Sequence, residues 1–135
     1  MFLSMLNEKE QKNFLEFAAI AMMADGKIEE SEKEVMEVYR RETGLLDYCI
    51  QNKKQEDLIM AFNASTKKAR RAVMIELAGV LDVDEVIDPS EEKWIVDIGK
   101  KLGFRDTEIR RMVRWTQDFN DLLTEGYELI LKEER

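Results

Sequence analysis

An internal repeat constrains the fold of this chain more than any other feature of its sequence. Residues 17–45 align without a gap with residues 76–104, fifty-nine positions further along. Both segments contain the pattern D-x-x-I-x-x-S-E, and in both a glycine, Gly44 or Gly103, follows the final glutamate by twelve residues. Each unit has one apolar face, which is buried when equivalent units pack together. The repeat predicts two helical hairpins packed face to face around a pseudo-twofold axis.

Helical spacing of apolar residues extends through nearly the whole chain. Strand-like alternation is nearly absent, and one proline and six glycines among 135 residues leave few positions where helices break. We expect helices over about 8–24, 30–43 and 55–62, a fourth capped by Ser65 and ending near Val83, a fifth that opens in "DEVIDPSEEK" and closes at Gly103, and a sixth that starts at Asp106 and bends or splits at Gly126. The prediction is a single all-α domain over residues 1–135, a compact bundle of about six to seven helices. In each repeat a third helix follows the hairpin: the third predicted helix in the first repeat and the sixth in the second.

The charge balance disfavours anionic partners. A net charge of −8 repels phosphate backbones, so we expect no nucleic-acid binding. Two basic clusters, "KKARR" at 67–71 and Arg110, Arg111 and Arg114, are interpreted as solvated helix faces. No segment approaches the roughly 20 apolar residues of a membrane span, and "MFLSML" is too short for a secretory signal. We therefore predict a cytoplasmic protein without direct membrane insertion.

The absence of histidine removes most familiar catalytic sites. Ser-His-Asp and Cys-His catalysis, HExxH metalloprotease sites and histidine-containing zinc sites all require that residue. The only cysteine, Cys49, cannot form an internal disulfide and is interpreted as a small buried apolar residue. Carboxylate acid/base chemistry through Asp25 and Asp84 would need both groups in one pocket, and no substrate-binding motif accompanies them. We therefore predict that the protein is not an enzyme.

The first copy of the shared pattern, "ADGKIEESE" at 24–32, is similar to the second half of an EF-hand loop. With Gly26 at loop position six, Asp25 and Glu32 occupy positions five and twelve. Positions one and three, however, are Ala21 and Met23, which offer no oxygen ligands and belong to the preceding predicted helix. An EF-hand is therefore excluded.

The second copy is richer in carboxylates and permits a different kind of cation site. Hard cations such as Ca²⁺ need several oxygen ligands but tolerate varied geometry. Helix capping accounts for part of the pattern, because Asp88, Pro89 and Glu91 fit an N-cap, a first helical residue and a capping-box glutamate. Glu32 fits the same capping position in the first copy.

Capping does not account for Asp25 and Asp84. Both follow the predicted end of a helix, where a negative charge meets the unfavourable end of the helix dipole. We therefore predict a site for Ca²⁺ or another divalent cation at these acidic helix junctions. Its candidate ligands are Asp25, Glu32, Asp84 and Glu91, with Asp82 and Asp88 as further candidates.

The two repeat segments also carry a family resemblance. "FAAIAMMADGKIEESEKEVMEVYRRETGL" and "ELAGVLDVDEVIDPSEEKWIVDIGKKLGF" resemble the TerB family of tellurite-resistance proteins, over roughly residues 8–125. The resemblance implies an all-helical, pseudo-symmetric domain with an acidic surface that binds divalent cations and works in stress-response complexes. The second copy reads "VDE" where the family has "ADG". Similar domains are fused to J-domain co-chaperones, but a J domain requires a histidine.

Two functions follow as expectations. The first is a non-enzymatic, stress-associated interaction module whose acidic junctions bind a cation and thereby organise a surface for a protein partner. The alternative is a metal-independent protein-binding or scaffold module, with a groove between the hairpins lined by methionine and aromatic residues. The abundant methionines also fit adaptable core filler: Met22, Met23, Met36, Met60, Met74 and Met112.

Overall fold

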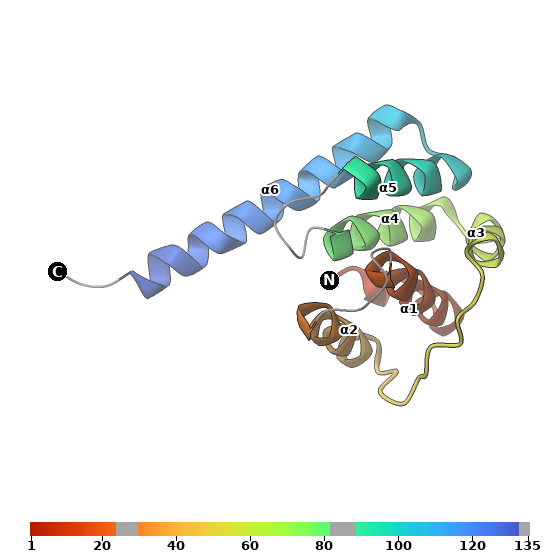
Figure 1. Ribbon diagram of the computed structural model, residues 1–135, viewed down its shortest axis with the longest axis horizontal. Helices are drawn as coiled ribbons and strands as arrows, with labels where there is room; N and C mark the ends of the chain where they lie inside the picture. The colour runs from red at the N-terminus through yellow and green to blue at the C-terminus, as the bar shows by residue number, and fades with distance from the viewer. Residues whose placement is uncertain (24–29, 82–88, 133–135) are drawn as a thin grey trace.

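The computed structural model describes residues 1–23, 30–81 and 89–132 and is all-helical over these ranges (Figure 1). Within them lie a short 3₁₀ helix, η1 (Leu3–Met5), and six α-helices that form a compact bundle. The α-helices are α1 (Glu8–Met22), α2 (Glu30–Thr43), α3 (Gln55–Asn63), α4 (Lys67–Leu81), α5 (Pro89–Lys101) and α6 (Asp106–Leu131). The predicted fold class is confirmed.

The helix boundaries follow the sequence repeat. α1 and α4 are both 15 residues long and occupy equivalent positions in the two copies. α2 and α5 begin at equivalent residues, Glu30 and Pro89. After these helices Gly44 and Gly103 both adopt a left-handed backbone, with φ of 76° and 91°, as expected for glycines that end helices. The chain thus contains two helix pairs, α1–α2 and α4–α5, that contact each other through α1 and α4.

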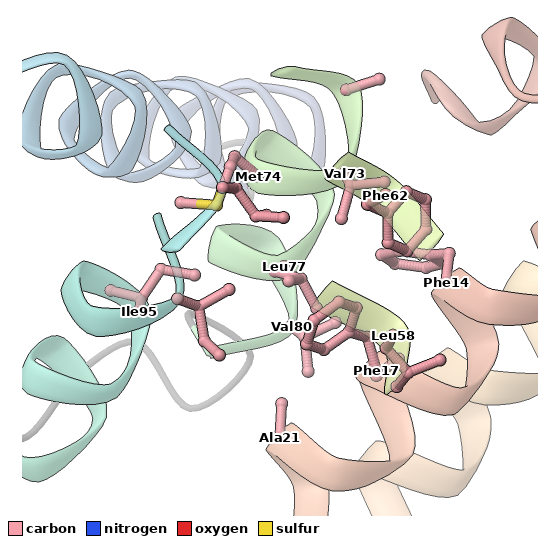
Figure 2. Packing of buried hydrophobic residues seen from close by; sticks show 14 of the residues in the cluster. Phe14, Phe17, Ala21, Leu58, Phe62, Val73, Met74, Leu77, Val80 and Ile95 are labelled. Carbon is pink, nitrogen blue, oxygen red and sulfur yellow. The ribbon is translucent and has the colours of Figure 1, made fainter. Parts of the chain in front are cut away.

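The core lies around this α1–α4 contact (Figure 2). Phe14 and Phe17 of α1 are completely buried, and Phe17 stacks on Phe62 of α3 with ring centroids 5.8 Å apart. Figure 2 shows α4 contributing Val73, Leu77 and Val80 to the same cluster, with Ile95 of α5 on its far side. Burial of this apolar surface, at roughly 25 cal/mol per Å², is the main force that stabilises the bundle.

Local signals explain most helix boundaries. Asn7 and Glu10 form the predicted capping box: the Asn7 side chain accepts from the Glu10 amide at 2.8 Å, and Glu10 accepts from the Asn7 amide at 2.9 Å. The prediction that Ser65 caps α4 was wrong by one residue. Thr66 Oγ1 accepts from the Ala69 amide at 3.1 Å, because α4 begins at Lys67 and residue 69 is its third position. α6 continues through Gly126 without splitting.

The two repeats differ in their third elements. In the first copy, an extended connector over residues 44–54 precedes α3, a helix of 9 residues that packs on α1. In the second copy, α6 starts almost directly after Gly103, runs for 26 residues and packs on α4 and α5. Figure 1 shows that the C-terminal half of α6 extends beyond the rest of the bundle.

Two sequence interpretations need correction. Cys49 is exposed, because it lies in the connector and not in a helix. Among the methionines interpreted as core filler, Met22, Met36 and Met74 are buried, whereas Met23 and Met60 are 47% and 70% exposed.

Among the described residues, no helix combines the length and apolar character needed to cross a membrane.

Candidate functional site

The predicted cation ligands fall partly outside the described residues. Asp25, Asp82, Asp84 and Asp88 lie in the undescribed stretches 24–29 and 82–88, so the structure does not test whether they converge. Glu32 and Glu91 are described, in the first turns of α2 and α5. Pro89 is the first residue of α5, as the capping interpretation predicts.

Three of the four helix ends that flank these stretches meet: those of α1, α4 and α5. A small cavity of about 160 Å³ is lined by Ala21 near the end of α1, Leu81 at the end of α4, and Ser90, Glu91 and Trp94 of α5. The end of α1 in the first repeat therefore lies close to the end of α4 and the start of α5 in the second. Over residues 1–23, 30–81 and 89–132, no three Asp, Glu, Cys or His side chains group closely enough to hold a metal ion.

A larger site is the groove between α2, α4 and the C-terminal half of α6, with a volume of about 390 Å³. One wall is an aromatic and aliphatic face of α6 formed by Trp115, Phe119, Leu123 and Tyr127, each four residues after the last. The four-residue spacing places these side chains along one side of the helix. We call this site the α6 groove.

The opposite wall and the floor of the α6 groove come from the other helices. Val35 and Tyr39 project from α2, while Ile75, Glu76 and Gly79 line the α4 side. Glu76 is the polar group at the floor, and its carboxylate accepts from the Phe2 amide at 2.7 Å. Burial and the nearby charges of Glu76 and Glu42 raise the pKa of Tyr39, so its phenol stays neutral. The Met1 amine contacts the Glu42 carboxylate and lies 3.3 Å from Glu76 Oε1.

Aromatic rings line one end of the α6 groove. Trp115 stacks on Phe119 at 5.5 Å between centroids and contacts Phe2 at 5.9 Å. Such pairs have defined geometry and add about 0.5–1.5 kcal/mol beyond simple area burial. The groove is therefore apolar and aromatic, with one acidic group at its floor. Among the described residues that line it, Met1 is the only methionine, and most of the large apolar side chains are aromatic.

The C-terminal half of α6 exposes unusually many apolar side chains. Leu123 and Tyr127 are 49% and 59% exposed, although they line the groove. The remaining exposed apolar residues of this half are Leu122, Leu129, Ile130 and Leu131. Apolar spacing in the sequence predicts a helix here but does not show that the rest of the bundle ends before these residues. The length of α6 is the signal for their exposure, because this helix is about twice as long as the other helices of the second repeat.

Glu16 is a buried carboxylate that serves the fold. It accepts hydrogen bonds from the Tyr48 hydroxyl at 2.6 Å and from the Gln51 and Lys53 amides at 2.8 and 3.0 Å. Between these two amides Asn52 adopts a left-handed φ of 55°, which asparagine tolerates. Burial alone would raise the pKa of Glu16, but these hydrogen bonds and the charge of Lys53 outweigh it and lower the pKa. Glu16 thus anchors the connector between α2 and α3.

The basic clusters make structural contacts. Arg110 Nε donates to Asp106 at 2.7 Å and its Nη1 donates to Glu92 at 2.5 Å, which links α6 to α5. In the "KKARR" cluster, Arg70 Nη1 donates to the Ser65 carbonyl at 2.9 Å, near the end of α3. Both contacts agree with helix-surface roles for these clusters.

Comparison with known proteins adds no relative. The chain matches no protein-family model, no curated protein and no solved structure. The resemblance to TerB proteins therefore stays a prediction from the two repeat segments.

Proposed function

We propose that this protein is a non-enzymatic interaction module whose α6 groove binds an amphipathic helix of a partner protein. The observation that carries the proposal is the four-residue row of Trp115, Phe119, Leu123 and Tyr127 on one wall, with Leu123 and Tyr127 about half exposed. Amphipathic helices bind such grooves through apolar side chains three or four residues apart.

The charges of the helices that form the groove favour a basic partner helix. α2 carries five glutamates against Lys33, Arg40 and Arg41. From residue 117 to residue 131, α6 carries only acidic charges: Asp118, Asp121, Glu125 and Glu128. An acidic surface accelerates association with a basic partner and disfavours an acidic one. A helix with apolar anchors on one face and lysines at its edges therefore fits this groove best.

Binding is testable with designed peptides. The probe is a helical peptide with leucine and phenylalanine on one face and lysine on the other, and a glutamate-for-lysine version serves as the charge control. Trp115 lines the groove, so its fluorescence in a Trp94→Phe variant reports occupancy. We expect micromolar binding of the basic peptide and at least about tenfold weaker binding of the acidic one.

A matched pair of variants locates the binding site. Leu123→Glu places a charge in the groove, while Leu122→Glu introduces the same change at the neighbouring residue, which does not line it. Both side chains are largely exposed, so both variants should fold. We expect only Leu123→Glu to abolish peptide binding. Equal binding by the two variants, or no binding of any peptide at millimolar concentration, would refute the proposal.

We also propose, as a second candidate, that the helix junctions bind a divalent cation. The supporting observation is the small cavity where Ala21, Leu81 and Glu91 meet, because it brings the ends of α1 and α4 to one place. Calcium and magnesium titrations would be followed by calorimetry and by Trp94 fluorescence in a Trp115→Phe variant. Trp94 lines the cavity, so binding should change its emission. The idea fails if millimolar metal gives no heat or spectral change, or if Asp25→Ala and Asp84→Ala bind as wild type.

We propose further, from the resemblance of the two repeat segments to TerB proteins, that the module is cytoplasmic and associated with a stress response. The peptide and metal titrations separate the two candidates. Peptide binding that survives chelation supports a metal-independent module, whereas binding that needs calcium supports a cation-organised surface.

A further inference from the structure

Gly79 lies in the last turn of α4, on the side of the helix that lines the α6 groove. It is partly exposed, and its backbone does not have the positive φ that favours glycine. Glycine in a helix is less favourable than alanine, because it loses more conformational freedom on folding. The backbone of α4 therefore gives no reason for glycine at this position.

Packing within the chain does not require glycine at position 79 either. Beyond the neighbouring backbone of α4, a Cβ built on Gly79 would meet only Thr116 Cγ2 among the described residues, at the ordinary contact distance of 3.9 Å. Gly99 is different, because a Cβ there would lie 2.5 Å from Ile109. The fold thus requires glycine at position 99 but accepts alanine at position 79.

The first repeat has a large side chain at the equivalent position. Gly79 corresponds to Ile20 of α1, fifty-nine residues earlier, and Ile20 packs against the core. In the second repeat this side chain is absent where α4 borders the α6 groove. The difference between the two repeats therefore leaves space on the groove side of α4.

The surroundings of Gly79 suit an apolar group of a bound partner. Thr116 is buried, and its hydroxyl donates to the Met112 carbonyl at 3.1 Å within α6, while its methyl group lies toward Gly79. Ile75, one turn before Gly79, lines the same side of the groove. Glu76 adds an acidic group of α4, which agrees with the basic partner helix proposed above.

We infer that Gly79 determines which partner helices the α6 groove accepts. The missing side chain admits one large apolar anchor of the partner, such as phenylalanine or leucine, over the backbone of α4. Glycine suits such a contact, because it allows a bound group to approach the backbone closely. This inference rests on the proposed function and adds the feature by which the groove selects its partner. A helix with a small residue at the anchor position should bind more weakly.

A peptide series tests the size of the space above Gly79. The probes are the basic helical peptide described above and versions in which each apolar residue in turn is replaced by alanine. Trp115 fluorescence in a Trp94→Phe background measures their dissociation constants. For the wild-type groove, we expect one anchor position where alanine weakens binding at least about tenfold.

Gly79→Ala should change the response at that one anchor position. Its methyl group occupies the space of the anchor, so the original peptide should bind about tenfold more weakly. The peptide with alanine at the anchor position should lose much less affinity, because its small side chain leaves room for the methyl group. Such coupling between one protein residue and one peptide residue indicates direct contact.

Two controls separate this effect from a change in the fold. Gly126→Ala makes the same substitution at a helical glycine that does not line the groove, and it should leave peptide binding within about twofold of the wild type. Thermal unfolding of Gly79→Ala should give a midpoint at or above that of the wild type, because alanine favours helix. A lower midpoint would show that the fold itself requires the glycine, and would overturn the inference.

The remaining outcomes distinguish the inference from the proposed function. If the wild type binds the basic peptide and Gly79→Ala binds every peptide equally well, or weakens all of them by the same factor, the inference fails while the proposed function stands. If the wild type binds no peptide of the series, the proposed function fails and the inference fails with it.

Discussion

The third helices of the two repeats, α3 and α6, show how equivalent positions acquire different tasks. α3 is short, packs on α1 and contributes the fully buried Phe62 to the core. α6 packs on α4 through its N-terminal half and leaves the C-terminal half with large exposed apolar side chains. The first helices of the two repeats, α1 and α4, are therefore equivalent in length and meet at the centre of the bundle. The third helices, α3 and α6, differ in length and in exposure.

A pair of equivalent residues shows the cause of this difference. Position 99 in α5 corresponds to position 40 in α2. A Cβ at Gly99 would lie 2.5 Å from Ile109 of α6, so only glycine permits α6 to cross α5 this closely. The first copy has Arg40, which instead pairs with Glu37 at 2.7 Å and donates to the Tyr48 carbonyl at 3.3 Å. The connector, and not a helix, therefore covers that part of α2.

The largest expected contrast in stability is between a buried residue of α3 and a half-exposed residue of α6. Phe62→Ala should lower the free energy of unfolding by about 3–5 kcal/mol, because Phe62 is buried and stacks on Phe17. Leu123→Ala on α6 should change it by less than about 0.5 kcal/mol in dilute solution. Urea unfolding of both variants measures the difference. Similar losses would show that the C-terminal half of α6 is part of the core after all.

The second contrast concerns the helix crossing. Gly99→Ala should cost about 1–3 kcal/mol, since its Cβ would overlap Ile109 and approach Met74 within 2.9 Å, and both of those side chains are fully buried. Arg40→Ala, at the equivalent position, should cost less than about 1 kcal/mol, because it loses one ion pair with the exposed Glu37 and one long hydrogen bond to the Tyr48 carbonyl. Thermal unfolding followed by circular dichroism compares the two. A Gly99→Ala variant as stable as the wild type would contradict the close crossing.

The third contrast tests the connector that only the first repeat has. Glu16→Gln should cost about 1–3 kcal/mol at neutral pH, because the amide cannot accept all three hydrogen bonds that the carboxylate accepts. The pKa of Glu16 lies below its ordinary value of 4.5 in the folded protein. The stabilisation is therefore complete above about pH 4.5 and is lost as the pH falls through the folded pKa. Urea unfolding from pH 7 to pH 3 should show the wild type converging on Glu16→Gln, and parallel curves would contradict this role.

The smallest expected effect is at Gly126. Gly126→Ala should stabilise the protein by about 0.5–1 kcal/mol, because a Cβ there meets nothing within 4 Å and alanine favours helix. Urea unfolding of this variant beside the wild type measures the gain. A variant less stable than the wild type would contradict the open surroundings of this position.

Much of the fold could be predicted from the sequence because its signals are local. The Asn7 capping box, the left-handed glycines Gly44 and Gly103, and the helix starts at Pro89 and Asp106 all depend on neighbouring residues. The repeat predicted two hairpins packed face to face, and the structure shows that they meet through α1 and α4. Ser65 was a near miss, because Ser65 and Thr66 are both acceptable caps and the choice depends on where the chain leaves α3.

The candidate site was harder to predict because it depends on long-range geometry. The α6 groove requires Val35, Glu76 and Tyr127 to meet, and no local pattern specifies this. The exposure of Cys49 follows from the anchoring of the connector by Glu16, a contact across 32 or more residues. The predicted ligands Asp25 and Asp84 lie outside the described residues, and the cation site stays a prediction.

The length of α6 has a mechanical consequence. Its 26 residues make a rod of about 39 Å, of which the first turns are held against α5 by the Gly99 crossing and by the Arg110–Glu92 ion pair. Thr116 is also buried, beside Gly79 of α4, and about 22 Å of the rod extends past it. A tilt of about 10° about that point displaces the tip by roughly 4 Å. A change that reorients α6 at its contacts with α5 and α4 would therefore reach the far end of the helix as a movement that opens or closes the α6 groove.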